Sequence, residues 1–186
     1  MTRLTLHSLE TAPDASKPLV ERAIRNNGYL PNLIAVLANA PAALETYLTV
    51  GEINARASLT LAEREVVQIT AARLHGCEFC IAGHSAIALK KAALSTADVV
   101  ALQEGQPTGQ ARLDAVQAFT AAVIAARGAA SGVSLSEFRA AGYGDRQALE
   151  VVLGVSLATL CNFANVLAAS PVNPELEPYR PGVLQA

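Results

Sequence analysis

The stretch of sequence that decides the fold of this chain is Glu65-Val-Val-Gln-Ile-Thr-Ala-Ala-Arg-Leu-His-Gly-Cys77-Glu-Phe-Cys80-Ile-Ala-Gly-His84. Residues with high helix propensity stand on both sides of Gly76, and glycine is a common residue just beyond the end of a helix. One helix is therefore expected to end near Leu74, and a second should begin around Cys77 and run to about Ala93. The break at Gly76 would let these two helices pack antiparallel.

Helix boundary signals continue outward from this stretch in both directions. Thr60 and Glu63 have the spacing of a capping box and predict the start of the first helix. Prolines that suit a first turn, polar caps and glycine stops predict further helices, which we place at Pro18 to Gly28, from Pro31, from Pro41, Ser95 to Gly105, Thr108 to Gly128, Ser134 to Gly142, and Asp145 to before Pro171. No segment alternates between apolar and polar residues over a sustained length, so no strand is expected. The sequence predicts an all-α protein.

The length and composition favour one helical bundle. The chain has 186 residues, of which 52% are hydrophobic and 16% charged, and Ala and Leu favour closely packed helices. We expect a single domain over residues 1–186, with N-terminal helices in 16–55, a redox core in 60–93, a second helical half in 108–170 and an extended C-terminal arm in 171–186. The run Glu65-Val66-Val67 recurs as Glu150-Val151-Val152, which suggests a degenerate repeat of two helical halves.

Charge and hydropathy restrict the partners and the compartment. The formal net charge is −2, without a basic stripe, so nucleic acid is not an expected partner. The mean hydropathy of +0.31 is high for a soluble monomer and favours a homo-oligomer. The segment from Val151 to Ala169 has no charged residue but carries a row of polar side chains, which favours a buried central helix over a membrane span. Without a recognisable secretion signal, we expect a cytoplasmic protein.

The cysteines carry the chemistry expected of this chain. Three are present, Cys77, Cys80 and Cys161, and a close pair in a reducing cytosol indicates catalysis, redox sensing or metal binding rather than a structural disulfide. If Cys77 opens a helix, the Cα atoms of Cys77 and Cys80 lie about 5 Å apart, within the span that a disulfide can close. The pair is therefore expected to oxidise reversibly.

His84 and Glu65 supply groups that exchange protons with the pair. His84 follows Cys80 by four residues and shares its helix face, so His84 is the expected base for Cys80. Cys77, at the helix start, is exposed to the positive end of the helix dipole, which favours its thiolate. Glu65 would reach the same face from the preceding helix and hold a proton or orient a water molecule.

Other interpretations of these residues remain open. The two cysteines could be buried apolar thiols, or Cys77, Cys80 and His84 could bind zinc with Glu65 as a fourth ligand. Structural zinc sites usually draw ligands from a second, distant segment, and no second Cys/His cluster exists here. We therefore expect no metal and no resident cofactor. Cys161 is expected to be a core residue.

The spacing of Glu65, Cys77, Cys80 and His84 resembles that of the alkylhydroperoxidase D-like branch of the carboxymuconolactone decarboxylase family. The residues from Ser134 to Ala169, and the Pro171-Val-Asn-Pro174 segment, are similar to the second half of its peroxidase-related members. The likeness extends from Pro31 to Tyr179.

This resemblance implies an all-α fold, oligomers (dimer, trimer or hexamer) and a thiol-dependent peroxidase that reduces organic hydroperoxides in antioxidant defence. It assigns peroxide attack to Cys80, resolution of the product to Cys77 and proton relay to His84 and Glu65. By the same resemblance the reductant is a small dithiol, such as a lipoyl group. Well-understood relatives carry a histidine where Phe79 stands, so the substrate is left open. A redox-sensing or disulfide-reductase module without peroxide turnover is the alternative.

Overall fold

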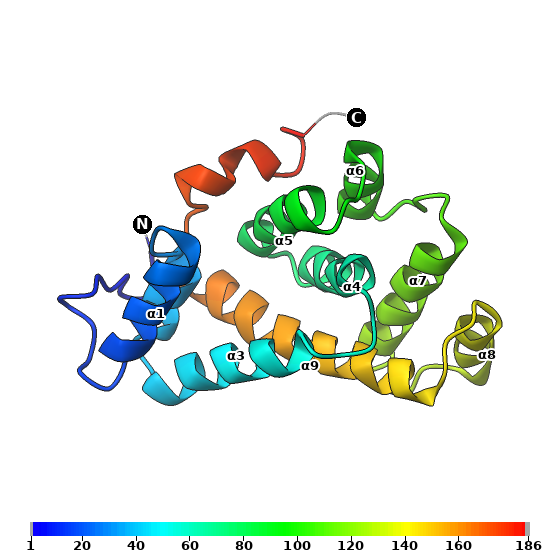
Figure 1. Ribbon diagram of the computed structural model, residues 1–186, viewed down its shortest axis with the longest axis horizontal. Helices are drawn as coiled ribbons and strands as arrows, with labels where there is room; N and C mark the ends of the chain where they lie inside the picture. The colour runs from blue at the N-terminus through cyan, green and yellow to red at the C-terminus, as the bar shows by residue number, and fades with distance from the viewer. Residues whose placement is uncertain (1, 185–186) are drawn as a thin grey trace.

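The computed structural model describes residues 2–184, which form helices without any strand in this range. Figure 1 shows the arrangement of these helices, coloured along the chain. The elements are α1 (Lys17–Asn27), α2 (Asn32–Leu37), α3 (Pro41–Asn54), α4 (Leu61–Leu74), α5 (Glu78–Lys91), α6 (Thr96–Glu104), α7 (Ala111–Ala125), α8 (Gly132–Ala140), α9 (Asp145–Ala168) and the 3₁₀ helix η1 (Pro174–Tyr179). The predicted all-α class is confirmed.

Most helix boundaries lie where the sequence signals predict them. The Thr60 hydroxyl accepts a hydrogen bond from the Glu63 backbone N–H, and the Glu63 carboxylate accepts one from the Thr60 N–H, so the capping box opens α4. Gly76 has φ +70°, a left-handed conformation that favours glycine, and it separates α4 from α5. The predicted helical hairpin is therefore present, with Cys77 as the N-cap residue of its second helix.

Two local predictions are wrong. The N-cap residue of α8 is Ser131, three residues before the expected Ser134, because the Ser131 hydroxyl accepts a hydrogen bond from the Ser134 backbone N–H. The C-terminal arm is not extended throughout: six of its residues form η1, which packs against α5 and buries Leu176. Residues 185–186 of the expected arm lie outside the described range.

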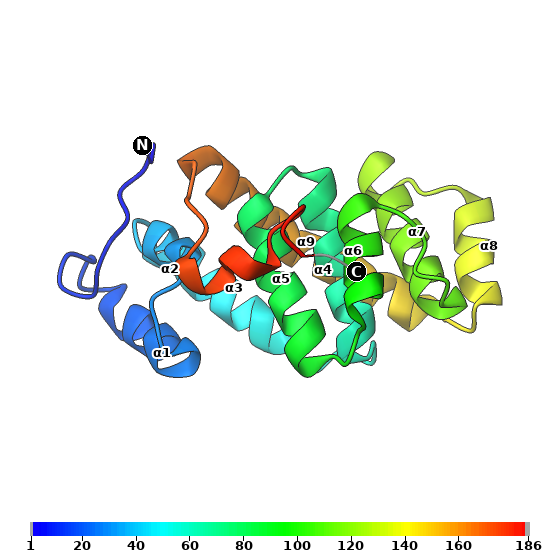
Figure 2. The same cartoon turned by 90° about the horizontal axis from the view of Figure 1, so that it is seen from above.

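Helix α9 runs along the length of the molecule beneath α4 and α5, with α1 to α3 towards one end and α7 and α8 towards the other (Figures 1 and 2). It packs against α2, α3, α4, α5 and α7. The buried apolar residues form two clusters, one around the cysteine pair and one between α4, α6, α7 and α8, and α9 contributes Cys161 to the first and Val151 to the second. One helix therefore connects both parts of the core.

The contact between α4 and α9 is close at Gly154. A Cβ atom at this position would lie 2.9 Å from Cγ1 of Val67, shorter than side chains tolerate. The Gln68 side-chain amide also donates a hydrogen bond to the Gly154 carbonyl, at 3.0 Å. Gly154 thus allows α9 to pack closely against α4 at Val67 and Gln68, close to Glu65 in the sequence.

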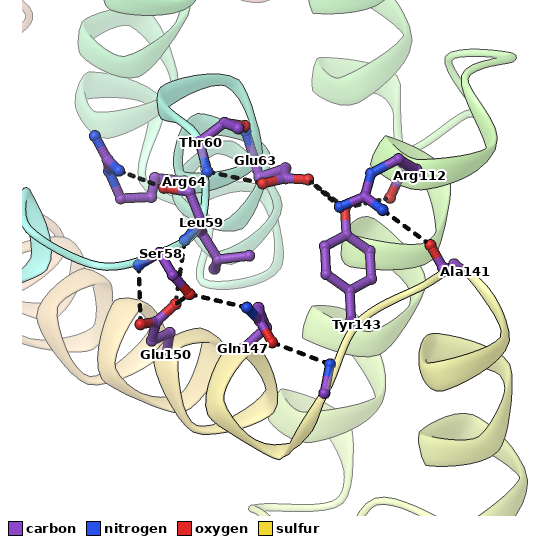
Figure 3. A network of polar contacts seen from close by, with 11 residues as sticks. Ser58, Leu59, Thr60, Glu63, Arg64, Arg112, Ala141, Tyr143, Gln147 and Glu150 are labelled. Carbon is purple, nitrogen blue, oxygen red and sulfur yellow. Dashed lines mark hydrogen bonds and ion pairs between the residues drawn. The ribbon is translucent and has the colours of Figure 1, made fainter.

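A polar network fixes the start of α4 against α7 and α9 (Figure 3). The buried carboxylate of Glu63 accepts hydrogen bonds from the Tyr143 hydroxyl and from Arg112. The carboxylate of Glu150 accepts hydrogen bonds from the Ser58 backbone N–H and hydroxyl. Because buried carboxylates are stable only when they are paired, this network ties the helix that carries Glu65 to the rest of the molecule.

By length and hydropathy alone, α9 could cross a membrane. Its packing on five other elements instead matches the expectation of a central helix.

The segment of α9 that corresponds to the α4–α5 hairpin in the suspected repeat runs on without a break. The two copies of Glu-Val-Val therefore lie in differently folded surroundings.

Candidate active site

Cys77 and Cys80 lie together at the N-terminus of α5. Their Sγ atoms are 2.6 Å apart and share a hydrogen bond, and the Cys80 backbone N–H donates to Sγ of Cys77 at 3.3 Å. Both residues are buried, with 2% and 4% of their surface exposed. The geometry brings the two sulfur atoms into position for exchange between a dithiol and a disulfide.

The two thiols differ in acidity. The hydrogen bond with Cys80 lowers the pKa of Cys77 below its ordinary value, with help from the Cys80 backbone N–H and against the effect of burial. Contacts with Cys161 and Cys77, together with burial, raise the pKa of Cys80. The thiolate of the resting pair is therefore favoured on Cys77, and Cys80 keeps its proton more firmly.

His84 and Glu65 form an ion pair, on the face of α5 that Glu65 was expected to reach. Nδ1 of His84 lies 2.7 Å from Oε2 of Glu65, and the side chains are 22% and 7% exposed. Burial by itself would lower the pKa of His84, but the charge and hydrogen bond of Glu65 outweigh it and raise the pKa. His84 is thus favoured as an imidazolium, with Nε2 free of hydrogen-bond partners among residues 2–184.

Asn165, on α9, is a site residue that the sequence reasoning did not identify. Its Nδ2 atom donates a hydrogen bond to Sγ of Cys80 at 3.4 Å, and only 3% of its surface is exposed. Hydrogen bonds from Asn165 also contribute to the lowered pKa of Cys77. An amide donor on this sulfur pair stabilises whichever sulfur carries the negative charge.

A cavity of about 330 Å³, here called the Cys80 cavity, opens on one side of the pair. Apolar side chains make up most of its wall. The lining residues that can ionise or react include Tyr47, Cys80, His84 and Cys161, together with Tyr29, Lys90, Lys91 and Glu175. Cys161 is buried in the core, as expected, and also contacts Cys80 at the cavity wall. Cys77 does not line this cavity, so a molecule bound there meets Cys80 and His84.

A second cavity of about 430 Å³, here called the Cys77 cavity, lies next to Cys77. It is lined by Cys77, Asn165 and Ser170, and by Glu78 and Arg180, which form an ion pair at 2.9 Å. Neither Cys80 nor His84 lines it. Phe79 lines both cavities and therefore belongs to the wall between them.

The structure brings the four site residues predicted from sequence into one region, but not with all the predicted contacts. Glu65 reaches His84, and the cysteines meet. No hydrogen bond joins His84 to Cys80 among residues 2–184; both instead line the same cavity. A histidine that also holds Glu65 is placed to act on a molecule in the cavity rather than directly on the sulfur.

The sequence contained one indication of Asn165. At the 85-residue offset of the suspected repeat, Cys80 corresponds to Asn165, and the two residues contact each other across α5 and α9. Tyr47 had no such indication, because its place in the cavity depends on how α3 packs. Within residues 2–184, no group of three or more His, Cys, Asp and Glu side chains is arranged to hold a metal ion.

Comparison by sequence identifies a family. Residues 41–132 match the carboxymuconolactone decarboxylase family, a range that includes Glu65, both cysteines of the pair and His84. No curated protein matches the chain at a significant level.

Solved structures resemble the whole fold. An alkylhydroperoxidase AhpD core, an uncharacterized peroxidase-related protein from Ralstonia eutropha JMP134, superimposes with a TM-score of 0.85 at 18% identity and covers 100% of this chain and 98% of that chain. An uncharacterized peroxidase-related protein from Silicibacter sp. TM1040 gives a TM-score of 0.77 at 19% identity, with 94% of each chain covered. The debrominase Bmp8 in complex with 2,3,4-tribromopyrrole gives 0.75 at 18% identity, with 95% of each chain covered. At these identities the similarity establishes the fold.

Proposed function

Because the chain belongs to the carboxymuconolactone decarboxylase family and has the alkylhydroperoxidase D-like fold, we propose that it is a thiol-dependent peroxidase for organic hydroperoxides. The observation that carries this proposal is the Cys77/Cys80 pair with Cys80 facing an apolar cavity that also contains His84. An apolar cavity suits the alkyl part of an organic hydroperoxide better than it suits hydrogen peroxide.

In the proposed oxidative step, Cys80 attacks the peroxide. Its thiol proton passes to the Cys77 thiolate, whose sulfur is 2.6 Å away. The Cys80 thiolate then attacks the terminal peroxide oxygen, the O–O bond breaks, and His84 gives its proton to the departing alkoxide. The products are an alcohol and a sulfenic acid on Cys80.

The proposed resolving step closes the disulfide. The Cys77 thiol attacks the sulfur of the Cys80 sulfenic acid, an S–S bond forms, and the hydroxyl group leaves as water with the thiol proton. Asn165 stabilises the Cys80 thiolate before attack, and Glu65 holds His84 in its protonated form. Two electrons thus pass from the cysteine pair to the peroxide.

The test is consumption of tert-butyl hydroperoxide with dihydrolipoamide as reductant, for the wild type, Cys80→Ser and Cys77→Ser. We expect turnover in the wild type, none in Cys80→Ser, and in Cys77→Ser a sulfenic acid on Cys80 that mass spectrometry detects. A wild type that does not turn over, although its thiols are intact, would reject peroxidase activity and favour the redox-sensing or disulfide-reductase alternative.

Reductive debromination is a second candidate, suggested by the fold shared with the debrominase Bmp8. Two electrons from the same cysteine pair would replace a carbon–bromine bond with a carbon–hydrogen bond and release bromide. Bromide release from 2,3,4-tribromopyrrole, assayed with the same three proteins and the same dithiol, distinguishes this activity from peroxide reduction.

We also propose that the protein acts in the cytoplasm as a homo-oligomer, without membrane or nucleic acid. Support for self-association comes from apolar side chains exposed on α9, namely Leu149, Val152, Phe163, Val166 and Leu167. Exposed apolar area of this kind is typical of a surface that another chain covers. Light scattering after size exclusion, with Leu149→Glu and Leu167→Glu, tests this: a wild type that runs as a monomer would refute it.

A further inference from the structure

We propose that the Cys77 cavity is a second substrate site, which binds the small dithiol that reduces the enzyme and directs it to Cys77. The proposal rests on the proposed function only in requiring that the Cys77/Cys80 pair cycles between dithiol and disulfide. The two cavities share only Phe79 among their lining residues, and each is lined by one of the two cysteines. Oxidant and reductant would therefore reach different sulfur atoms through different cavities.

Two residues that line the Cys77 cavity have side-chain oxygen atoms that lack hydrogen-bond partners among residues 2–184. Oδ1 of Asn165 and Oγ of Ser170 are buried, both residues line the cavity, and neither atom has a hydrogen-bond partner in the structure among residues 2–184. A buried polar atom without a partner costs free energy, and in native proteins it usually marks a place where another molecule binds. Both atoms accept hydrogen bonds, so they suit a ligand with N–H, O–H or S–H donors.

The exposed part of the cavity is also polar. Arg180 donates to Glu78 and Glu177, all three line the cavity, and the Arg180 side chain is 35% exposed. By contrast, the Cys80 cavity is mostly apolar. A dithiol with an amide group matches the polar cavity, whereas an alkyl hydroperoxide matches the apolar one.

The chemistry of reduction follows from this placement. One thiolate of the dithiol attacks Sγ of Cys77, the Cys77–Cys80 bond breaks, and a mixed disulfide joins Cys77 to the reductant. The second thiol of the reductant then attacks the reductant sulfur that is bonded to Cys77. This breaks the mixed disulfide, releases Cys77 as a thiolate and leaves the reductant as a cyclic disulfide. The two protons of the dithiol return to Cys80 and His84, so the resting state is restored.

Thiol acidity alone favours the opposite attack, because the more acidic thiol leaves more readily and Cys77 is the more acidic of the two. Two groups compensate for this. Asn165 donates to Sγ of Cys80, and His84, which takes up the proton released by the attacking thiol of the dithiol, lines the cavity on the Cys80 side. The departing Cys80 thiolate thus meets a hydrogen-bond donor and a cation.

The experiment measures the two half-reactions separately in single turnovers. Reduced enzyme is mixed with tert-butyl hydroperoxide, and enzyme oxidised with diamide is mixed with dihydrolipoamide; free thiols are counted by alkylation and mass spectrometry. Ser170→Phe fills the Cys77 cavity, and Ile87→Phe is the matched change in the Cys80 cavity, since both positions are partly exposed lining residues.

We expect Ser170→Phe to slow reduction by dihydrolipoamide by about tenfold or more and to leave peroxide oxidation unchanged, since displacing a reactant by 1 Å from a productive position has such effects. Ile87→Phe should show the reverse. If Ser170→Phe leaves reduction unchanged, or if Ile87→Phe slows reduction as much as oxidation, the second site does not exist.

A second matched pair covers the case in which Ser170→Phe does not fold. Glu177→Trp and Lys91→Trp each place a bulky ring at an exposed lining residue, one in each cavity. The same separation of effects is expected, and the same contrary results would overturn the proposal. Failure of the peroxidase assignment looks different: the wild type would not be oxidised by the peroxide, while the diamide-oxidised enzyme would still be reduced by dihydrolipoamide.

Discussion

Nδ1 of His84 lies 2.7 Å from Oε2 of Glu65, and the two side chains come from the helices on either side of Gly76. The pairing links the two halves of the hairpin at the cavity that Cys80 lines. It also sets the charge of His84, because Glu65 raises the pKa of the imidazole against the effect of burial.

Glu65→Gln should lower the free energy of unfolding at the pH values where His84 is protonated. A histidine whose pKa is raised by folding stabilises the folded state below its unfolded pKa of about 6.5, and this contribution is lost as the pH rises through the folded pKa. We expect Glu65→Gln to lower stability at pH 6 by about 1.5–3 kcal/mol, and the Tm by roughly 3–12 °C. The difference from wild type should narrow by pH 9.

Thermal melts between pH 6 and pH 9 check this, with Glu52→Gln as control, because Glu52 forms an exposed ion pair with Arg22. The control should differ little from wild type at any pH. A deficit in Glu65→Gln that is independent of pH would show that the His84 charge does not contribute.

Alkylation should label Cys77 before Cys80. The thiolate is the reactive form, and Cys77 has the lowered pKa of the pair while that of Cys80 is raised. We expect iodoacetamide at pH 6.5 to modify Cys77 several times faster than a free cysteine with a pKa near 8.5. Peptide mapping after brief labelling locates the adduct, and first labelling at Cys80 would contradict the assigned acidities.

Asn165→Leu should slow oxidation by peroxide. The substitution keeps the side chain close in size but removes the amide that donates to Sγ of Cys80 at 3.4 Å. A hydrogen bond to a charged group contributes about 1.5–3 kcal/mol, so the rate should fall roughly 10- to 100-fold. The pH at which the pair begins to be alkylated should also rise, which a loss of packing alone would not cause. Asn162→Leu, nearby on α9, is the control, because its side chain contacts His75 and Cys161 and neither cysteine of the pair.

Gly154→Ala should destabilise the fold. The added methyl group would lie 2.9 Å from Cγ1 of Val67 in the contact between α4 and α9. Overpacking of a core typically costs about 1–3 kcal/mol, which denaturant unfolding can measure. Gly51→Ala serves as the matched control: a Cβ atom there meets nothing within 4 Å, and alanine is the better helix former. Equal stability of Gly154→Ala and wild type would mean that the helices are not held as closely as described.

Local signals predicted the helices and the four residues of the motif, because caps, glycine stops and i,i+4 spacing act over a few residues. The start of α8 was missed because Ser131 and Ser134 both precede a helical segment, and only the folded chain shows which hydroxyl accepts a backbone N–H. The helical turn of η1 was missed because it depends on burial of Leu176 against α5.

The rest of the candidate site depends on packing between distant segments. Asn165 is 85 residues from Cys80, and its amide meets the sulfur only because α9 crosses beneath α5. The raised pKa of Cys80 likewise depends on its contact with Cys161, a residue that the sequence assigned only to the core. Two separate cavities, each lined by one cysteine of the pair, cannot be predicted from a spacing pattern.

Phe79 stands in the wall of both cavities, and this has a consequence for how the protein can evolve. A substitution of Phe79 changes the shape of both cavities at once, so under the proposed function it would alter the preference for oxidant and the preference for reductant together. Residues that line a single cavity, such as Ile87 or Ser170, permit each preference to drift separately.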